Sequence, residues 1–586
     1  MAEFVGIDPA GARRLIGSMG DAVQRAKALR GPLAASIVEA GPDWPAGPGA
    51  ETLDGVMRFL DEARRDLTWR TQTIERIEGA DASAGGLRTA EFAFGDVSSA
   101  RAAGTLAGKK TLAAWQDYLK DPSVDNWEKV QATLGEGRGK TSDGAYATGL
   151  LTALGAATFG AVFAAVSARN QNDPRGYGPE NLKEAGKDLK PLAEAFASAD
   201  AAGTLPAGLR DHVMDEFAIG DMAALLGLAR QSREFVLRAG AKVLQYGGNR
   251  DSGKDWNTYW LVKALGQDAL TTQRFLTTGD NAVLLLRPEV VNGLPGTDFE
   301  KLLATALDGA LAPGAGDAAL RRDAWLNVID LYSRKNFWPA LTEPSPVGEV
   351  LAKHVSQYFP EIINIWNRAQ DVGGVTEEKE WRSVDSKVIV GFFGGLLQSS
   401  AALPSLKAGY GDFLRKIDLG AEHPFGDAAT EAARKEQRNR FYGKAVSAGA
   451  LASVLFSGLH EADLSQEKSD KAVVELLTLP LDVLLAGAGG KVVDGVISET
   501  SLGKAIDIGE KNSLKDAIEG FLDGDGAGDA SELVDAFIDA QVAAFNVSRQ
   551  SHGHQSLGDS DLRELRTLFA GQLTPVLKSA LAARGG

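Results

Sequence analysis

The stretch Gly41-Pro42-Asp43-Trp44-Pro45-Ala46-Gly47-Pro48-Gly49 separates two long amphipathic segments at the start of this 586-residue chain. Its prolines cannot continue a helix, and its glycines permit the backbone to reverse direction. The flanking segments, residues 8–40 and 51–78, would extend about 50 and 40 Å as α-helices at about 1.5 Å per residue. Because the connection is short, the two helices must lie antiparallel. We therefore predict a helical hairpin over residues 1–79.

The first segment has a clear start and one apolar face. Asp8 can accept hydrogen bonds from free amides of the first helical turn, and Pro9 stands where no N–H is needed. Gly31-Pro32 is expected to interrupt or kink the helix. The apolar side chains recur mostly three or four residues apart, at Leu15, Ile16, Met19, Val23, Ala26, Leu29, Leu33 and Ile37.

The second segment has a heptad repeat. Leu53, Leu60, Leu67 and Ile74 recur every seven residues, and Val56, Ala63 and Ile77 follow three of them by three positions. This spacing is typical of a helix that pairs with another helix. Trp44 is expected to cover apolar surface at the end of the pair, and Gly47 permits the turn around it. The candidate binding residues are thus Trp44, Gly47, Leu53, Leu60, Leu67 and Ile74.

This segment resembles the Trp-X-Gly (ESAT-like) helical hairpins of type VII secretion, and the layout is similar to that of long actinobacterial proteins that carry such a hairpin. Two features depart from the family pattern. Trp44-Pro45-Ala46-Gly47 has one extra residue between Trp and Gly, and none of the nine tyrosines has an acidic residue four positions later, as the export signal of the family requires. Phe92 and Asp96 have that spacing with a different aromatic residue. The resemblance implies export and a small helical-hairpin partner or self-association.

The simpler alternative is a hairpin that packs only against its own chain, because amphipathic helix pairs are common in all-α proteins. Export without a cleavable signal would have to use such a folded hairpin. Arg13-Arg14 is followed by an apolar run that ends at Asp21, too short for the apolar region of a signal peptide. The expected location is therefore secreted or at the cell envelope by a signal-peptide-independent route, with a cytoplasmic location as the alternative.

Composition limits the class of protein. A net charge of −16 argues against sequence-independent binding to nucleic acid or to anionic lipid. The chain has no cysteine, so disulfides, thiolate metal sites and cysteine nucleophiles are excluded. At this length more than one core is expected. We predict an all-α protein with a hairpin (1–79), a connector with two Trp-bearing helices (80–143), a central helical domain (144–375) and an Ala/Gly-rich C-terminal helical domain (376–586).

Helical periodicity recurs throughout the body, for example over 181–198, 221–244 and 347–370. The residues from Gly79 to Gly86 are predicted to form a flexible stretch. The best strand candidate is Ala282 to Val291, although Pro288 within it speaks against a central strand. All ten tryptophans lie between residues 44 and 381, which favours a separate C-terminal unit.

One run raises the question of a membrane. Residues 144–168 contain no charge over 25 positions, longer than the roughly 20 residues that span a bilayer. However, the run is mostly Ala, Gly and Thr, and its large apolar side chains cluster on one side of a helix. A helix in contact with lipid would be apolar all round. We therefore interpret the run as a core helix and do not expect membrane contact.

Four motifs suggest chemistry and fail on their spacing. Residues 135–141 nearly match a phosphate-binding loop, but the first glycine should be at Leu134, so a solvated link is favoured. His460-Glu461 lacks a second histidine at Leu464. A calcium loop at Asp523, Asp525 and Asp529 would place Val534 where a glutamate is needed, and His552 and His554 have no further ligands nearby. No metal, cofactor or enzymatic activity is therefore predicted.

The leading hypothesis is a non-enzymatic protein associated with type VII-like secretion, which acts as exported or envelope-docked scaffold or cargo through helix–helix surfaces. The alternative is a membrane-active or polymorphic toxin. In that case residues 144–168 and the C-terminal apolar helices would be released from the soluble form, or residues 505–586 would contain an enzyme of unrecognised type.

Overall fold

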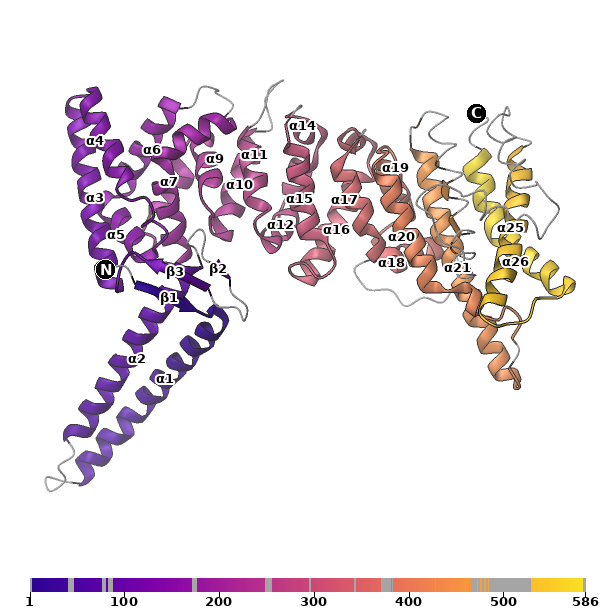
Figure 1. Ribbon diagram of the computed structural model, residues 1–586, viewed down its shortest axis with the longest axis horizontal. Coiled ribbons are helices and arrows are strands. Elements are labelled where there is room, and N and C mark those ends of the chain that lie inside the picture. Colours follow the sequence, from indigo (N-terminus) through magenta and orange to yellow (C-terminus); the bar gives the residue numbers. More distant parts are fainter. Residues whose placement is uncertain are drawn as a thin grey trace. The chain divides into compact units, whose positions relative to one another are not determined.

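The computed structural model confirms the all-α fold class (Figure 1). The structure describes residues 3–40, 47–75, 81–82, 88–170, 176–247, 256–294, 297–341, 344–369, 381, 383–426, 428–462, 464, 472, 475–476, 479–480, 483 and 529–582. The chain forms two compact units, Met1–Gln267 (unit 1) and Asp268–Gly586 (unit 2). The junction at 267/268 falls within the segment 144–375 that was expected as a single domain.

Unit 1 contains a pair of long helices near its N-terminus and a helical body after them. The pair consists of α1 (Pro9–Ala40) and α2 (Gly47–Ile74). The helices of the body are α3 (Val97–Lys120), α4 (Val124–Gly135), α5 (Gly144–Leu154), α6 (Ala156–Asn170), α7 (Pro179–Ala201), α8 (Leu209–Glu216), α9 (Ile219–Leu228), α10 (Arg233–Gly247) and α11 (Trp256–Leu265).

Unit 2 is also helical throughout its described residues. Its elements are α12 (Ala269–Leu276), α13 (Asn281–Leu286), α14 (Pro288–Val291), α15 (Phe299–Leu311), α16 (Ala318–Tyr332), η1 (Lys335–Leu341), α17 (Pro346–Val355), η2 (Ser356–Tyr358), α18 (Phe359–Ala369), α19 (Ser386–Leu396), α20 (Ala402–Ile417), η4 (Leu419–Ala421), α21 (Glu431–Glu461), α25 (Asp529–Ser551) and α26 (Asp559–Ala582).

The pairing of α1 with α2 is antiparallel. Arg30 Nε lies 2.7 Å from Asp54 Oδ1, and Arg13 forms an ion pair with Glu75, so the two chains run in opposite directions. The predicted helix start is confirmed, because Asp8 Oδ1 accepts from the Ala10 amide at 3.0 Å and Oδ2 from the Gly11 amide at 3.0 Å. The helix continues through Pro32 without the expected interruption.

A small sheet lies beside the hairpin and was not predicted. Strands β1 (Glu3–Ile7), β2 (Asp81–Ala82) and β3 (Arg88–Phe92) form an antiparallel sheet in the order β1-β3-β2. In the register of β1 with β3, Glu3 pairs with Phe92. Two residues of the predicted flexible stretch 79–86 therefore form β2, and the remaining six lie outside the described residues.

The best strand candidate, Ala282 to Val291, is helical, in agreement with the objection raised by Pro288. These residues belong to α13 and α14. Pro288 is the first residue of α14, where its missing N–H and fixed φ suit a helix start.

The uncharged run 144–168 forms two helices and not the single helix that was expected. Gly155, with φ +78°, ends α5, and α5 and α6 are bent by 94°. Both helices bury large apolar side chains, including Leu151, Phe159 and Phe163. Among the described residues, no one helix has the length and hydropathy of a bilayer crossing, and this bent pair meets the test only when its two helices are taken together.

Glycines explain why the run contains so few large side chains. A Cβ atom on Gly104 of α3 would lie 2.0 Å from the Tyr146 carbonyl oxygen of α5, and one on Gly149 of α5 would lie 2.2 Å from the Arg101 carbonyl oxygen of α3. The two backbones therefore approach more closely than any side chain would permit. Small residues in this run serve helix packing within unit 1.

One buried acid in unit 1 gives a pH-dependent prediction. Asp221 is 7% exposed and accepts a hydrogen bond from Ser167 Oγ, and burial raises the pKa of its carboxyl group above the ordinary 3.8. The folded chain then binds this proton more tightly than the unfolded chain, so ionisation lowers the free energy of unfolding as pH rises from about 4 through the folded pKa.

We expect Asp221→Asn to gain stability relative to wild type between pH 4 and pH 8, because asparagine has no charge to bury. Urea unfolding at the two pH values measures the difference. Asp211→Asn is the control, because the Asp211 side chain is 72% exposed. If the difference between Asp221→Asn and wild type is the same at both pH values, the assignment of a burial penalty to Asp221 is wrong.

Candidate interaction surface of the N-terminal hairpin

The base of the hairpin is fixed to the body of unit 1 through Trp69. Its indole Nε1 donates to Asp143 Oδ2 at 2.9 Å, and both side chains are buried. Asp143 Oδ1 also accepts from the Ala145 and Tyr146 amides at 2.8 and 3.1 Å, so the same carboxylate caps α5. The Trp69 ring packs edge-on against Phe92 of β3 at 5.7 Å. Hence α2, the sheet and α5 share one buried contact.

This contact belongs to the Gly-rich segment 135–144, of which residues 135–141 were interpreted as a solvated link; that interpretation is only partly right. The segment does form turns between α4 and α5, but two of its polar side chains are buried. Thr141 Oγ1 donates to Glu194 Oε2 at 2.6 Å, and Asp143 binds Trp69. Lys140, the lysine that a phosphate-binding loop would use, is exposed.

The predicted binding residues have different environments. Trp44 lies outside the described residues, and Gly47 is the first residue of α2. Leu53, Leu60 and Leu67 are half-buried, and Ile74 is fully buried.

The stripe of Leu53, Leu60, Leu67 and Ile74 lies on the α1 side of α2, whereas Val56, which follows the same repeat, is 44% exposed. Leu60 and Leu67 lie about one turn on either side of Arg64, and a Cβ atom on Gly20 of α1 would contact the Arg64 side chain at 4.0 Å. The stripe therefore contributes to the pairing of α1 with α2. Its use by another protein stays a prediction.

The exposed apolar side chains of the hairpin lie beside this stripe. Four of them lie within five residues of the ion pair between Arg30 and Asp54, which sets the level of the two antiparallel helices. We call these four residues the hairpin face, and they are Leu29, Leu33, Val56 and Phe59, exposed by 61%, 39%, 44% and 68%. Phe59 was not singled out from the sequence, although it is the most exposed of the four.

Helical geometry places the four side chains on one side of the pair. At roughly 100° per residue, Leu29 and Leu33 are rotated by roughly 50 to 90° from the side of α1 that meets α2, marked by the buried Val23 and Ala26. Val56 and Phe59 are rotated about α2 by roughly 40° and 100° from Leu60 of the heptad stripe, in the same sense. Because the helices are antiparallel, equal rotations lead to the same side.

Opposite charges border the hairpin face. Arg25 lies one turn before Leu29 on the α1 edge, and Glu62 lies three residues after Phe59 on the α2 edge. Both side chains are exposed, and neither forms an ion pair within the described part of the chain. Asp21 lies four residues before Arg25 and Arg58 four residues before Glu62, so each edge has charges of both signs, and a second copy would complement the face where its Glu62 meets Arg25.

The other sequence motifs have no metal-binding cluster in the part of the chain that the structure describes. No group of three or more His, Asp or Glu side chains that could hold a metal ion occurs among the described residues. His460 is exposed at the end of α21. Asp523 and Asp525 lie outside the described residues, and Asp529 is the first residue of α25. Comparisons of this chain with protein-family models, curated proteins and solved structures find no match.

Proposed function

We propose that this protein acts through binding surfaces, as a scaffold or cargo of a type VII-like secretion pathway, and that its hairpin face is the docking surface. The single observation that carries the proposal is the exposed cluster of Leu29, Leu33, Val56 and Phe59 on a helix pair whose base is fixed to the body. Exposed apolar clusters rimmed by polar residues are typical of interaction sites.

The occupant that we propose is the hairpin of a second copy, in which Arg25 and Glu62 could pair across the contact. A two-fold axis along the hairpin would place α1 of one copy over α2 of the other, so that Arg25 approaches Glu62 of the second copy and the two hairpin faces meet. The product is a four-helix arrangement in which α1 and α2 each gain a further neighbour. Since the face is small, we expect a dissociation constant in the micromolar range.

Phe59→Asp should weaken this association at least tenfold, because a carboxylate would be buried in the apolar centre of the contact. Sedimentation velocity over a concentration series measures the effect. Leu106→Asp is the matched control, because Leu106 is 59% exposed on α3, outside the hairpin face. A purified chain that stays monomeric at all concentrations, or that dimerises equally well with Phe59→Asp, contradicts self-association, and a small helical hairpin would then be the remaining candidate partner.

The secretion part of the proposal has its own test. Deleting residues 1–79 would also remove β1 and Trp69, and so would damage the body. We suggest excising residues 21–64 and joining the ends by a short glycine-rich loop, which retains Trp69 and the base of both helices. Loss of the protein from the envelope and culture medium supports the proposal, and unchanged location argues against it.

A further inference from the structure

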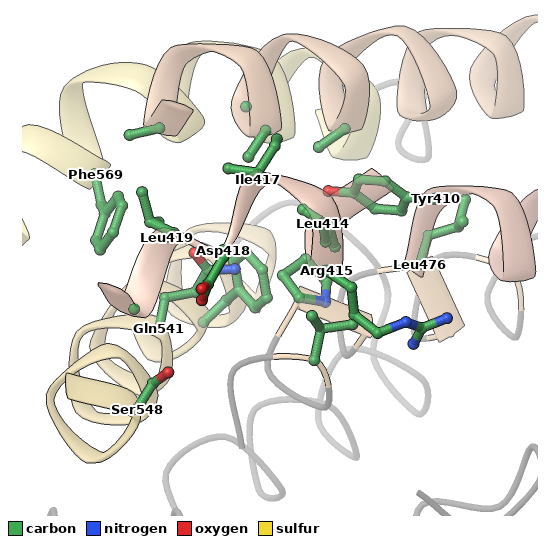
Figure 2. Close-up of a pocket in the computed structure, with 18 of the residues that line it drawn as sticks. Tyr410, Leu414, Arg415, Ile417, Asp418, Leu419, Leu476, Gln541, Ser548 and Phe569 are labelled. Carbon is green, nitrogen blue, oxygen red and sulfur yellow. The ribbon is translucent and has the colours of Figure 1, made fainter. Parts of the chain in front are cut away.

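Unit 2 contains a cavity of about 350 Å³ that the proposed function does not use. Helices α20, α21, α25 and α26 and the 3-10 helix η4 contribute to its wall. Figure 2 labels lining residues from α20, η4, α25 and α26. Most of the lining is aliphatic or aromatic, and it includes Leu414, Ile417, Phe456, Leu476, Phe537 and Phe569. Ligand pockets commonly have volumes of about 300 to 1,000 Å³ and an apolar lining with a few polar groups.

Two polar side chains border this cavity without a hydrogen-bond partner among the described residues. Tyr410 of α20 is 1% exposed and Gln541 of α25 is 7% exposed. Burial raises the pKa of the Tyr410 hydroxyl above its ordinary value, so it remains a neutral donor. A buried donor without an acceptor is unfavourable. Both groups are therefore positioned to bind polar atoms of a ligand inside the cavity.

The charged groups at the cavity already have partners. Arg415 forms an ion pair with Asp412, and His552 Nε2 lies 3.3 Å from Asp418 Oδ1. Asp418 and His552 are partly exposed, with 48% and 30% of their side chains accessible, so they mark the side of the cavity that is open to solvent. The buried, neutral groups Tyr410 and Gln541 are therefore the ones expected to select the ligand.

Ser548, His552 and Asp418 are also the residue types of a hydrolase triad, but their geometry is wrong for one. His552 Nδ1 lies 2.8 Å from the Ser548 carbonyl oxygen. With Nε2 beside Asp418, neither ring nitrogen is free to take the proton of the Ser548 hydroxyl. The cavity is thus better suited to binding than to acyl transfer.

We propose that this cavity binds a single acyl chain, whose carboxyl or ester oxygens accept hydrogen bonds from Tyr410 and Gln541. The apolar lining matches the hydrocarbon chain. Two neutral donors match the two oxygens of one carboxyl group. The volume suits one chain.

The test uses the full-length chain and the fluorescent fatty acid cis-parinaric acid. We expect saturable binding that palmitic acid reverses by competition. Tyr410→Phe should raise the dissociation constant about five- to tenfold, because it removes one hydrogen bond. Ala452→Phe, which fills the cavity, should abolish binding. Tyr332→Phe is the matched control, because the Tyr332 hydroxyl donates to the Leu286 carbonyl at 3.3 Å and Tyr332 is not part of the cavity wall.

Methyl palmitate as a second competitor distinguishes free from esterified chains. Displacement by both compounds assigns the site to acyl groups in general, and displacement by palmitic acid alone assigns it to free fatty acids. Circular dichroism confirms that each variant is folded, and Tyr410→Phe suffices if Ala452→Phe does not fold. Absence of saturable binding, or equal binding by wild type and Tyr410→Phe, overturns the proposal.

Discussion

Gly104→Leu is expected to destabilise unit 1 by about 3 kcal/mol or more, at or beyond the upper end of the usual effect of overpacking. The Cβ atom of any side chain at this position would lie 2.0 Å from the Tyr146 carbonyl oxygen and 2.8 Å from the Tyr146 carbonyl carbon. Because these are backbone atoms of α5, no rotamer change can relieve the clash. The two helices would have to separate, which would disturb the neighbouring contacts of α5 with α7 and α2.

Thermal unfolding followed by circular dichroism measures this effect. The control is Gly17→Leu in α1, where an added Cβ meets nothing within 4 Å. That variant should be as stable as wild type or slightly more stable, since leucine has the higher helix propensity. If both variants melt at the wild-type temperature, α3 and α5 do not pack through their backbones.

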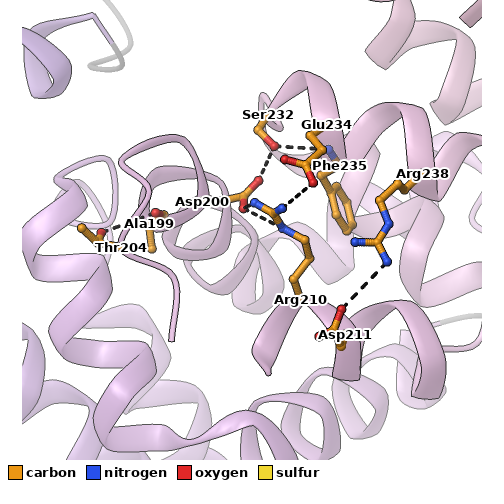
Figure 3. A network of polar contacts seen from close by, with 9 residues as sticks. All are labelled: Ala199, Asp200, Thr204, Arg210, Asp211, Ser232, Glu234, Phe235 and Arg238. Atoms are coloured by element: carbon orange, nitrogen blue, oxygen red, sulfur yellow. Dashed lines mark hydrogen bonds and ion pairs between the residues drawn. The ribbon is translucent and has the colours of Figure 1, made fainter. Parts of the chain in front are cut away.

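Arg210→Met is the second substitution with a large expected effect, about 3 to 5 kcal/mol. The Asp200 side chain is fully buried, and it accepts hydrogen bonds from the Arg210 guanidinium and the Ser232 hydroxyl (Figure 3). Methionine would leave this carboxylate without its countercharge. Arg210 also lies 2.8 Å from Glu234, but Glu234 is exposed, so water can replace that contact.

The companion variant Arg238→Met separates a buried ion pair from an exposed one. Arg238 lies 3.9 Å from Asp211, and both side chains are exposed, so its loss should change the free energy of unfolding by less than about 1 kcal/mol. Adding Asp200→Asn to Arg210→Met should restore part of the lost stability, because asparagine has no charge to bury. Equal, small effects of Arg210→Met and Arg238→Met in urea unfolding would show that the Asp200 carboxylate does not depend on Arg210.

Features set by local interactions could be predicted from the sequence. The start of α1 follows from Asp8-Pro9, since the capping carboxylate acts on amides two and three residues away. The segment 181–198 lies within α7, and helical periodicity alone predicts it. By contrast, the periodic segment 221–244 is divided between α9 and α10.

Features that join distant residues could not be predicted in the same way. The sheet pairs Glu3 with Phe92, and strands this short have too few residues for a clear alternation. The break at Gly155 depends on tertiary packing, because the run 144–168 contains several glycines and the sequence does not say which adopts a positive φ. The bond between Trp69 and Asp143 joins residues 74 positions apart, so only the fold brings them together.

In the hairpin, too, one feature could be predicted from the sequence and another could not. Its antiparallel pairing follows from heptad spacing and a short connection. The position of its free apolar surface does not, because exposure depends on which face of each helix is used in the pairing. The heptad stripe turned out to face α1, and the hairpin face lies beside it, with Phe59 as its most exposed member.

Cysteine cross-linking tests the central claim most directly, because the chain has no cysteine of its own. A Val56→Cys variant places one thiol on the hairpin face, and Leu106→Cys places one on α3 outside it. With a short bismaleimide linker at micromolar protein concentration, we predict a covalent dimer for Val56→Cys and none for Leu106→Cys. A Val56→Cys chain that stays monomeric, or equal cross-linking at both positions, would contradict the claim that this face joins two copies.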